Sequence, residues 1–148
     1  MFIGASPAST GGGIKTTTLA TLILTVKTFI LGKEDIEIYN RRISYSIVNK
    51  AIGVFFMSLT IVVISTLILT ISEPKFNLIE SLFEVISALA TVGLSIAGSP
   101  NLSSIGKSVI IFCMFAGRVG SLTVLIAIAA RGGKKQLIRY PEGKIIVG

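Results

Sequence analysis

The stretch that decides the fold is residues 76–98, FNLIESLFEVISALATVGLSIAG. Its helical part, about Leu78 to Ala90, is too short to cross a bilayer, which takes about 20 apolar residues. Asn77 is a suitable N-cap, and Glu80 stands at the third helical position, which is the capping-box pattern. A short apolar helix of this kind predicts either a core helix or a segment that enters a membrane and returns.

Long apolar segments lie on both sides of this helix. Ala51 to Ser72 contains no charged residue, and Ser108 to Ala130 contains only Arg118. Each is long enough to cross a bilayer. A third apolar segment, Ile14 to Leu31, carries two lysines, whose ammonium groups can reach the interface or a cavity.

The composition is that of a membrane protein. Of the 148 residues, 51% are hydrophobic and only 14% are charged, against about 25% in soluble domains. The net charge of +7 does not indicate nucleic-acid binding, because the basic residues lie between the apolar runs. With no histidine and a single cysteine, Cys113, the chain offers neither a zinc cluster nor an internal disulfide, and we expect Cys113 to be a buried apolar side chain.

Charge also predicts the orientation. Residues 32–50 and the tail, 131–148, are rich in lysine and arginine, whereas residues 73–107 contain only two lysines. The positive-inside rule therefore places the loop and the C-terminus in the cytoplasm.

The four residues after the short helix have the form of an ion filter. The helix should stop near Thr91, where Gly93 and β-branched residues break its pattern. In Thr91-Val92-Gly93-Leu94, glycine allows the backbone to turn its carbonyl oxygens toward a dehydrated potassium ion. The C-terminal end of the short helix would add negative partial charge. An ordinary turn after a helix is the alternative.

The N-terminal stretch MFIGASPASTGGGIKTTT looks at first like a phosphate-binding loop. That motif requires glycine directly before the lysine, and here Ile14 precedes Lys15. No strand fits before Gly4, and the helix that follows is apolar. Glycines in an apolar helix instead predict a hinge or gate, because irregular backbone at membrane depth occurs only inside protein or beside a water-filled cavity. A surface linker is the other interpretation.

Arg118 is the most costly residue to bury, because a charge at the bilayer centre costs about 2.5–3.5 kcal/mol on insertion scales. We expect it to face a pore or a polar partner, with Gly117 and Gly120 allowing close backbone approach. A fixed charge about 5 Å from a cation opposes it by roughly 3 kcal/mol at an effective dielectric constant of about 20. Arg118 is thus a candidate barrier; a purely structural salt bridge is the alternative.

Glu80 and Glu84 lie four residues apart and share one helical face. Either both face an outer aqueous mouth, or one is held by a partner near the filter. We favour the second arrangement, in which the carboxylate supports the filter.

Four stretches, GASPASTGGGIKTTT, FEVISALATVGLS, GRVGSLTVLIAIA and RYPEGKIIVG, occur in this order. Together they resemble the last part of the Trk/Ktr/HKT potassium transporters, and the tail resembles that of the Ktr-type membrane subunit. The resemblance extends from Met1 to Gly148.

The resemblance implies an all-α membrane protein, with half of a gated helix and one complete span, pore helix, filter and span of a potassium-channel-like fold. The implied segments are a broken membrane helix with an intramembrane gating loop (1–31, from the third pore module), a cytoplasmic loop (32–50), the fourth pore module (51–130) and a basic cytoplasmic tail (131–148). Within the module they are a span (51–72), a pore helix (77–90), the filter (91–95) and a second span (108–130).

The resemblance also implies site residues. Gly93 matches the filter glycine of the module, within the filter Thr91, Val92, Gly93 and Leu94. Arg118 matches an arginine beneath the filter that meets the gating loop. The implied gating loop consists of Ser6, Ala8, Ser9, Thr10, Gly11, Gly12 and Gly13.

The function implied is potassium uptake across the cell membrane by a multi-pass subunit, with K+ as the transported ion and Na+ as a stimulator. Its implied partners are the lipid bilayer, a second copy of the full-length subunit and a cytosolic nucleotide-binding regulatory ring, with no nucleic acid. Since four modules surround an ion in this family, we expect the chain to be a fragment.

Two other functions compete. One is a non-conducting membrane protein whose short helix only packs and whose tail makes assembly or lipid contacts. The other is an enzyme that uses Lys15 and the threonines on a phosphate. We expect no enzyme, because the sequence offers no paired catalytic carboxylates, histidine or metal cluster.

Overall fold

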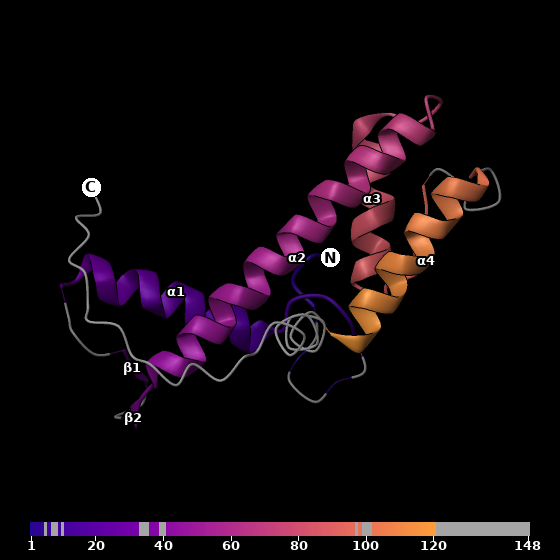
Figure 1. Ribbon diagram of the computed structural model, residues 1–148. Helices are drawn as coiled ribbons and strands as arrows, with labels where there is room; N and C mark the ends of the chain where they lie inside the picture. Colours follow the sequence, from indigo (N-terminus) through magenta and orange to yellow (C-terminus); the bar gives the residue numbers. More distant parts are fainter. Residues whose placement is uncertain are drawn as a thin grey trace, which may run out of the picture.

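Four helices and a pair of very short strands make up the described part of the chain (Figure 1). The computed structural model describes residues 1–4, 6, 9, 11–32, 36–38, 41–96, 98 and 102–120. In chain order the elements are α1 (Thr16–Ile30), β1 (Glu37–Ile38), β2 (Arg41–Arg42), α2 (Tyr45–Ser72), α3 (Leu78–Leu89) and α4 (Ser104–Val119). The predicted tail, 131–148, lies outside the described residues.

The helical prediction holds, and the strand pair is an addition to it. β1 and β2 pair antiparallel, with Glu37 opposite Arg42 and Ile38 opposite Arg41. They lie within the segment that was expected to be a loop, where two-residue strands leave no periodic signal in the sequence.

α2 runs through the middle of the described structure (Figure 1). Among the described residues it is the single helix that is long and apolar enough to cross a membrane. The helix contains the whole predicted span, 51–72, and begins earlier, because residues 45–50 continue it into the expected loop. The reason is a local cap: the Ser44 hydroxyl accepts a hydrogen bond from the Ser46 N–H at 3.3 Å. With 28 residues the helix is about 42 Å long, more than the roughly 30 Å of a hydrocarbon core.

The N-terminal segment becomes helical only at Thr16, after the stretch that is predicted to be a gating loop. None of the described residues before Thr16 is helical. The Gly4 N–H donates to the Ile14 carbonyl at 2.7 Å, and the Ile14 N–H donates to the Phe2 carbonyl at 3.2 Å. Ile14 is buried, with 1% of its surface exposed, so the two ends of the loop are fastened together.

α3 has the boundaries and the cap that its sequence predicts. Asn77 and Glu80 form the reciprocal capping box, and the helix of 12 residues is about 18 Å long. It is therefore too short to cross a membrane, as expected.

α4 differs from the predicted span at both ends. It begins before Ser108, because the Ser103 hydroxyl caps it by accepting from the Gly106 N–H at 3.2 Å. It ends before Gly120, whose φ of 89° is not helical. Residues 121–130, the remainder of the predicted span, lie outside the described residues.

One hydrogen-bonded joint brings the end of α2 and the start of α4 together. The Glu73 carboxylate, just beyond α2, accepts from the Ser103 N–H at 2.6 Å, and the hydroxyls of Ser72 and Ser103 lie 3.2 Å apart. Hydrogen bonds from the Ser103 hydroxyl and N–H lower the pKa of Glu73. α3 leaves from this joint and its other end reaches Gly117, near the far end of α4. The chain between α2 and α4 therefore runs from the joint along α3 toward the far end of α4 and then returns to the joint.

The core lies where α2, α3 and α4 pack together (Figure 1). Leu69, Val85 and Cys113 from the three helices are completely buried. The Cys113 thiol donates to the Ser65 hydroxyl at 3.2 Å, which confirms Cys113 as a buried side chain.

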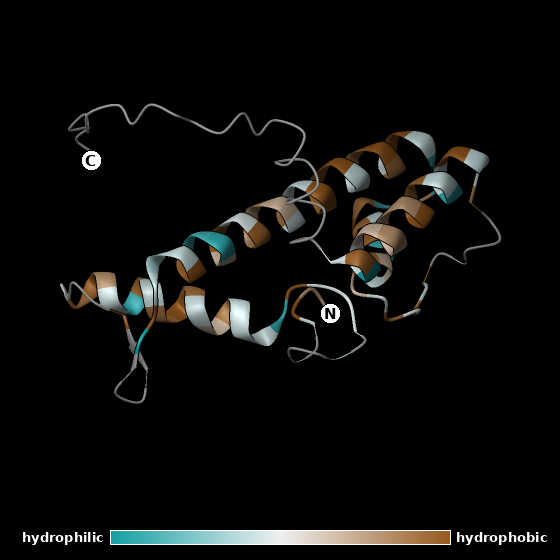
Figure 2. Cartoon of the chain, turned by 60° about the horizontal axis from the view of Figure 1, so that its bottom comes forward, coloured by the Kyte–Doolittle hydropathy of each residue, from teal (hydrophilic) through white to brown (hydrophobic). Residues whose placement is uncertain are grey.

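Much of the apolar surface faces outward (Figure 2). Phe29 at the end of α1 is 86% exposed, and Ile71 and Ile79 are 81% and 76% exposed. Exposed apolar surface of this kind needs lipid or other protein against it.

Candidate functional site

The C-terminal end of α3 is a Schellman turn that carries a threonine where glycine is usual. The Val92 N–H donates to the Ser87 carbonyl at 3.0 Å, and the Thr91 N–H donates to the Ala88 carbonyl at 3.1 Å. Thr91 consequently has a φ of 55°, the left-handed region that disfavours β-branched residues. The predicted helix end near Thr91 is confirmed, and the strain marks this residue for a role beyond the turn.

Beyond the turn, the chain runs back along α3 and is held by its side chains. The Ser87 hydroxyl donates to the Leu94 carbonyl at 2.5 Å. One helical turn earlier, a Glu84 carboxylate oxygen accepts from the Ser95 hydroxyl at 2.6 Å and from the Ile96 N–H at 2.8 Å. These contacts fix residues 92–96 on the face of α3.

The two glutamates of α3 have separate structural tasks. Glu80 accepts from the Asn77 N–H at 2.9 Å and closes the capping box. Glu84 is buried, with 5% of its surface exposed, and holds the chain that follows the predicted filter. The favoured prediction, a carboxylate that supports the filter segment, agrees with these contacts.

The glycine-rich loop lies against the end of α3, although it is far away in the sequence. The Gly12 N–H donates to the Thr91 hydroxyl at 2.9 Å across 79 positions. A Cβ at Gly12 would lie 2.7 Å from the Leu89 carbonyl oxygen and 3.0 Å from that of Gly117. A Cβ at Gly117 would collide with the same Leu89 oxygen. The loop, α3 and α4 thus meet at a single peptide group.

Lys15 stabilises the loop from within. Its ammonium group donates to the carbonyls of Ser9 and Gly11, at 3.0 Å each, and the Ser9 N–H donates to the Ser6 carbonyl at 3.1 Å. The lysine is therefore bound to the loop's own oxygens, which argues against the phosphate-binding interpretation. The other predicted loop residues, Ala8 and Thr10, lie outside the described residues.

A hollow of about 470 Å³ brings the predicted filter and the predicted barrier residue together. Arg118, in the last turn of α4, borders the same space as Thr91 and Gly93. Gly93 has a φ of 80°, and its α-carbon faces open space. Val92 and Leu94 do not line this hollow. The full lining is Ser87, Ala88, Thr91, Gly93, Met114, Phe115 and Arg118.

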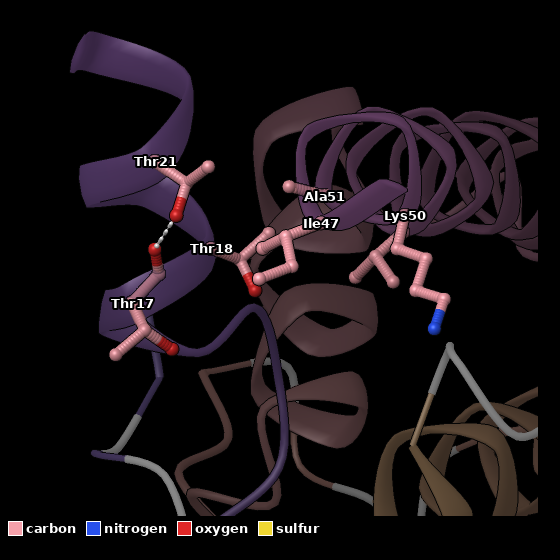
Figure 3. Close-up of a pocket in the computed structure, with 7 residues that line it drawn as sticks. Thr17, Thr18, Thr21, Ile47, Lys50 and Ala51 are labelled. Carbon is pink, nitrogen blue, oxygen red and sulfur yellow. Dashed lines mark hydrogen bonds between the residues drawn. The ribbon is translucent and has the colours of Figure 1, made fainter. Parts of the chain in front are cut away.

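A second hollow, of about 240 Å³, lies between α1 and the start of α2 (Figure 3). Thr17, Thr18 and Thr21 line one side, and the Thr21 hydroxyl donates to the Thr17 carbonyl at 2.8 Å. Figure 3 shows the ammonium group of Lys50 directed away from these threonines. The hollow gathers no predicted site residue.

Sequence reasoning missed two contacts of the site and was wrong about one glycine. The bond from Ser87 to Leu94 and the contact of Gly12 with Thr91 join residues whose pairing leaves no periodic signal. Within the described residues the expectation that Gly120 allows close approach is wrong, because none of their atoms lies within 4 Å of a Cβ placed there; this glycine serves the turn that ends α4. The same expectation for Gly117 is confirmed.

A family model for TrkH, described as a cation transport protein, matches residues 1–136. The chain belongs to this family. Its members are transport proteins and not enzymes, and the resemblance to Trk/Ktr transporters is confirmed.

Curated relatives of this TrkH-family chain include potassium transporters. It is 44% identical over 151 residues to Ktr system potassium uptake protein D of Bacillus subtilis and 40% identical over 148 residues to Ktr system potassium uptake protein B of the same species. It is 39% identical over 152 residues to the potassium/sodium uptake protein NtpJ of Enterococcus hirae. Each match covers 100% of this chain but only 32%, 33% and 34% of the respective relative. The chain thus spans about a third of the length of these relatives.

Proposed function

We propose that this TrkH-family chain is the C-terminal part of a channel-like transporter that takes up potassium across the cell membrane. The names of its relatives support potassium as the ion, and the name of NtpJ supports sodium as a second ion. The observation that carries the proposal is the end of α3, where a half-length helix delivers Thr91 and Gly93 to a hollow that Arg118 also lines.

The filter assignment follows from the carbonyl groups. The C-terminal end of a helix carries negative partial charge, which favours a nearby cation. Among the described residues, no hydrogen bond is made to the carbonyl oxygens of Thr91, Val92 and Gly93. Unoccupied backbone oxygens next to a helix end are what a dehydrated potassium ion requires.

The gate assignment follows from the packing beneath this stretch. The loop from Ser6 to Gly13 reaches the filter through the bond between Gly12 and Thr91, so a movement of the loop acts directly on a filter residue. Arg118 borders the same hollow, and at about 5 Å its charge would oppose a cation by roughly 3 kcal/mol at an effective dielectric constant of about 20. We assign the loop as gate and Arg118 as barrier.

The remaining assignments are part of the same proposal. Residues 1–31 belong to a third pore module and residues 51–130 to a fourth, in a multi-pass protein with a cytoplasmic C-terminus. The complete subunit forms a homodimer and docks on a cytosolic nucleotide-binding regulatory ring. The outward apolar faces of α1 and α2 support contact with lipid or with the other modules.

The test replaces Gly93 by serine in the full-length subunit and measures K+ and Na+ uptake in cells that lack other potassium transporters. We expect loss of potassium over sodium preference, because a side chain at φ 80° disturbs the carbonyls. Gly32→Ser is the matched control, since Gly32 also has a positive φ (62°) and open space around it but lies at the far end of α1. Unaltered preference in Gly93→Ser would overturn the filter assignment, and a wild-type subunit without uptake above the background of these cells would favour a non-conducting membrane protein.

A further inference from the structure

Ser87 is bonded to the chain on both sides of Gly93. Its carbonyl accepts from the Val92 N–H at 3.0 Å, and its hydroxyl donates to the Leu94 carbonyl at 2.5 Å. One residue of α3 therefore fixes the position before the glycine through its backbone and the position after it through its side chain.

The surroundings make this contact durable. Ser87 is 3% exposed, so water has little access to compete for its hydrogen bonds. Glu84, one turn earlier on the same face, fixes Ser95 and Ile96. Of residues 92–96, all of them described, Gly93 alone makes no hydrogen bond to α3.

From this geometry, and resting on the proposed function, we infer that Ser87 is a positioning residue that determines which carbonyls of the filter face the ion. A hydroxyl at 2.5 Å occupies the Leu94 oxygen and turns it toward the helix. The oxygens of Thr91, Val92 and Gly93 accept no hydrogen bond within the described part of the chain and remain for the cation. This module then supplies three backbone oxygens and withholds the fourth.

The consequence is chemical selectivity. A filter favours potassium over sodium through the number and the positions of its oxygens. A freed Leu94 carbonyl would add an oxygen whose position is not fixed and would let residues 93–94 adapt to the smaller ion. Ser87 should therefore act on the preference between ions more than on the amount of ion that passes.

The experiment uses Ser87→Ala in the full-length subunit, with initial rates of K+ and Na+ uptake measured over a range of concentrations. We expect the ratio of kcat/KM for K+ to that for Na+ to fall about fivefold, the factor that corresponds to one net hydrogen bond. The drop should come mainly from faster sodium uptake. Ser87→Thr, which keeps the hydroxyl donor, should restore most of the ratio.

Ser81→Ala is the matched control. Ser81 lies on the same helix, is fully buried, and its hydroxyl has no hydrogen-bond partner among the described residues. The same chemical change there breaks no contact with the filter segment, so the ratio should stay at the wild-type value. An equal loss of ratio in both variants would reduce Ser87 to a packing role and overturn the inference.

The other outcomes are also decisive. If Ser87→Ala keeps the wild-type ratio while Gly93→Ser loses it, the inference is wrong and the proposed filter stands. If neither variant alters the ratio, the filter assignment fails, and a wild-type subunit without uptake above the background would overturn the proposed function itself. Should Ser87→Ala not accumulate in the membrane, Ser87→Cys keeps the volume with a weaker donor; a wild-type ratio in that variant would likewise overturn the inference.

Discussion

Replacing Thr91 by glycine tests whether the strained threonine is retained for its bond to the loop. The left-handed conformation costs an L-residue about 1–2 kcal/mol, which glycine would recover. The lost hydrogen bond to Gly12, 2.9 Å long, is worth about 0.5–1.5 kcal/mol. Glycine also raises the conformational entropy of the unfolded chain, which lowers the stability of the folded state by about 0.4–1 kcal/mol. These terms nearly cancel, so we expect the stability of Thr91→Gly to lie within about 1 kcal/mol of the wild type.

Two further variants separate the contributions. Thr91→Ala keeps the backbone strain and loses the bond, so it should be destabilised by about 1 kcal/mol. Thr91→Ser keeps the hydroxyl and should retain the bond. Both Thr91→Gly and Thr91→Ala remove the hydrogen bond between the loop and residue 91, so both should lose the regulation of potassium uptake. Only Thr91→Ala should also lose stability.

The assay pairs thermal unfolding of the full-length subunit in detergent with uptake measured with and without the proposed cytosolic regulatory ring. A Thr91→Gly variant that is more stable by the whole strain energy and is still regulated would refute the reasoning. It would show that the hydroxyl contributes nothing to the coupling between the loop and the filter.

Three other predictions follow from the described contacts. Gly117→Ala places a methyl group on the Leu89 carbonyl and should destabilise the subunit by about 1–3 kcal/mol in thermal unfolding; an unchanged melting temperature would contradict the packing. Since the pKa of Glu73 is lowered in the folded chain, its stabilisation is present above its usual pKa of about 4.5 and is lost as the pH falls through the folded value. Glu73→Gln should therefore show a flatter stability profile below about pH 4.5 in acid unfolding, and a profile as steep as the wild type would exclude the bond to Ser103 as the cause. Arg118→Ala should raise leakage of potassium through the unregulated transporter, measured as efflux, and unaltered flux would leave Arg118 a structural role only.

Local sequence signals were enough to predict the bounds of α3, because its apolar periodicity, its capping box and the break at Gly93 all agree. They were less reliable at the ends of the longer helices. Serines at 44 and 103 start α2 and α4 earlier than hydropathy indicates, because a cap adds polar residues to a helix that an apolar window excludes.

Local sequence signals could not predict the contacts of the candidate site. The pairing of Gly12 with Thr91 depends on how distant segments pack, and neither residue type nor spacing encodes a partner 79 positions away. The family resemblance placed both residues near a filter, yet only the structure joins them. Ser87 was overlooked for a related reason, since a serine inside an apolar helix has no distinguishing pattern until its acceptor is known.

The meeting of two glycines at the Leu89 peptide restricts the ways in which these segments can move. A side chain at Gly12 or at Gly117 would clash with the same Leu89 carbonyl oxygen. The backbones are therefore packed too closely for α4 to slide along its axis past α3. These glycine contacts do not by themselves oppose a rotation about the Leu89 peptide or a sideways displacement of the loop. The proposed gate is therefore expected to open by rotation about the end of α3, which stays in place.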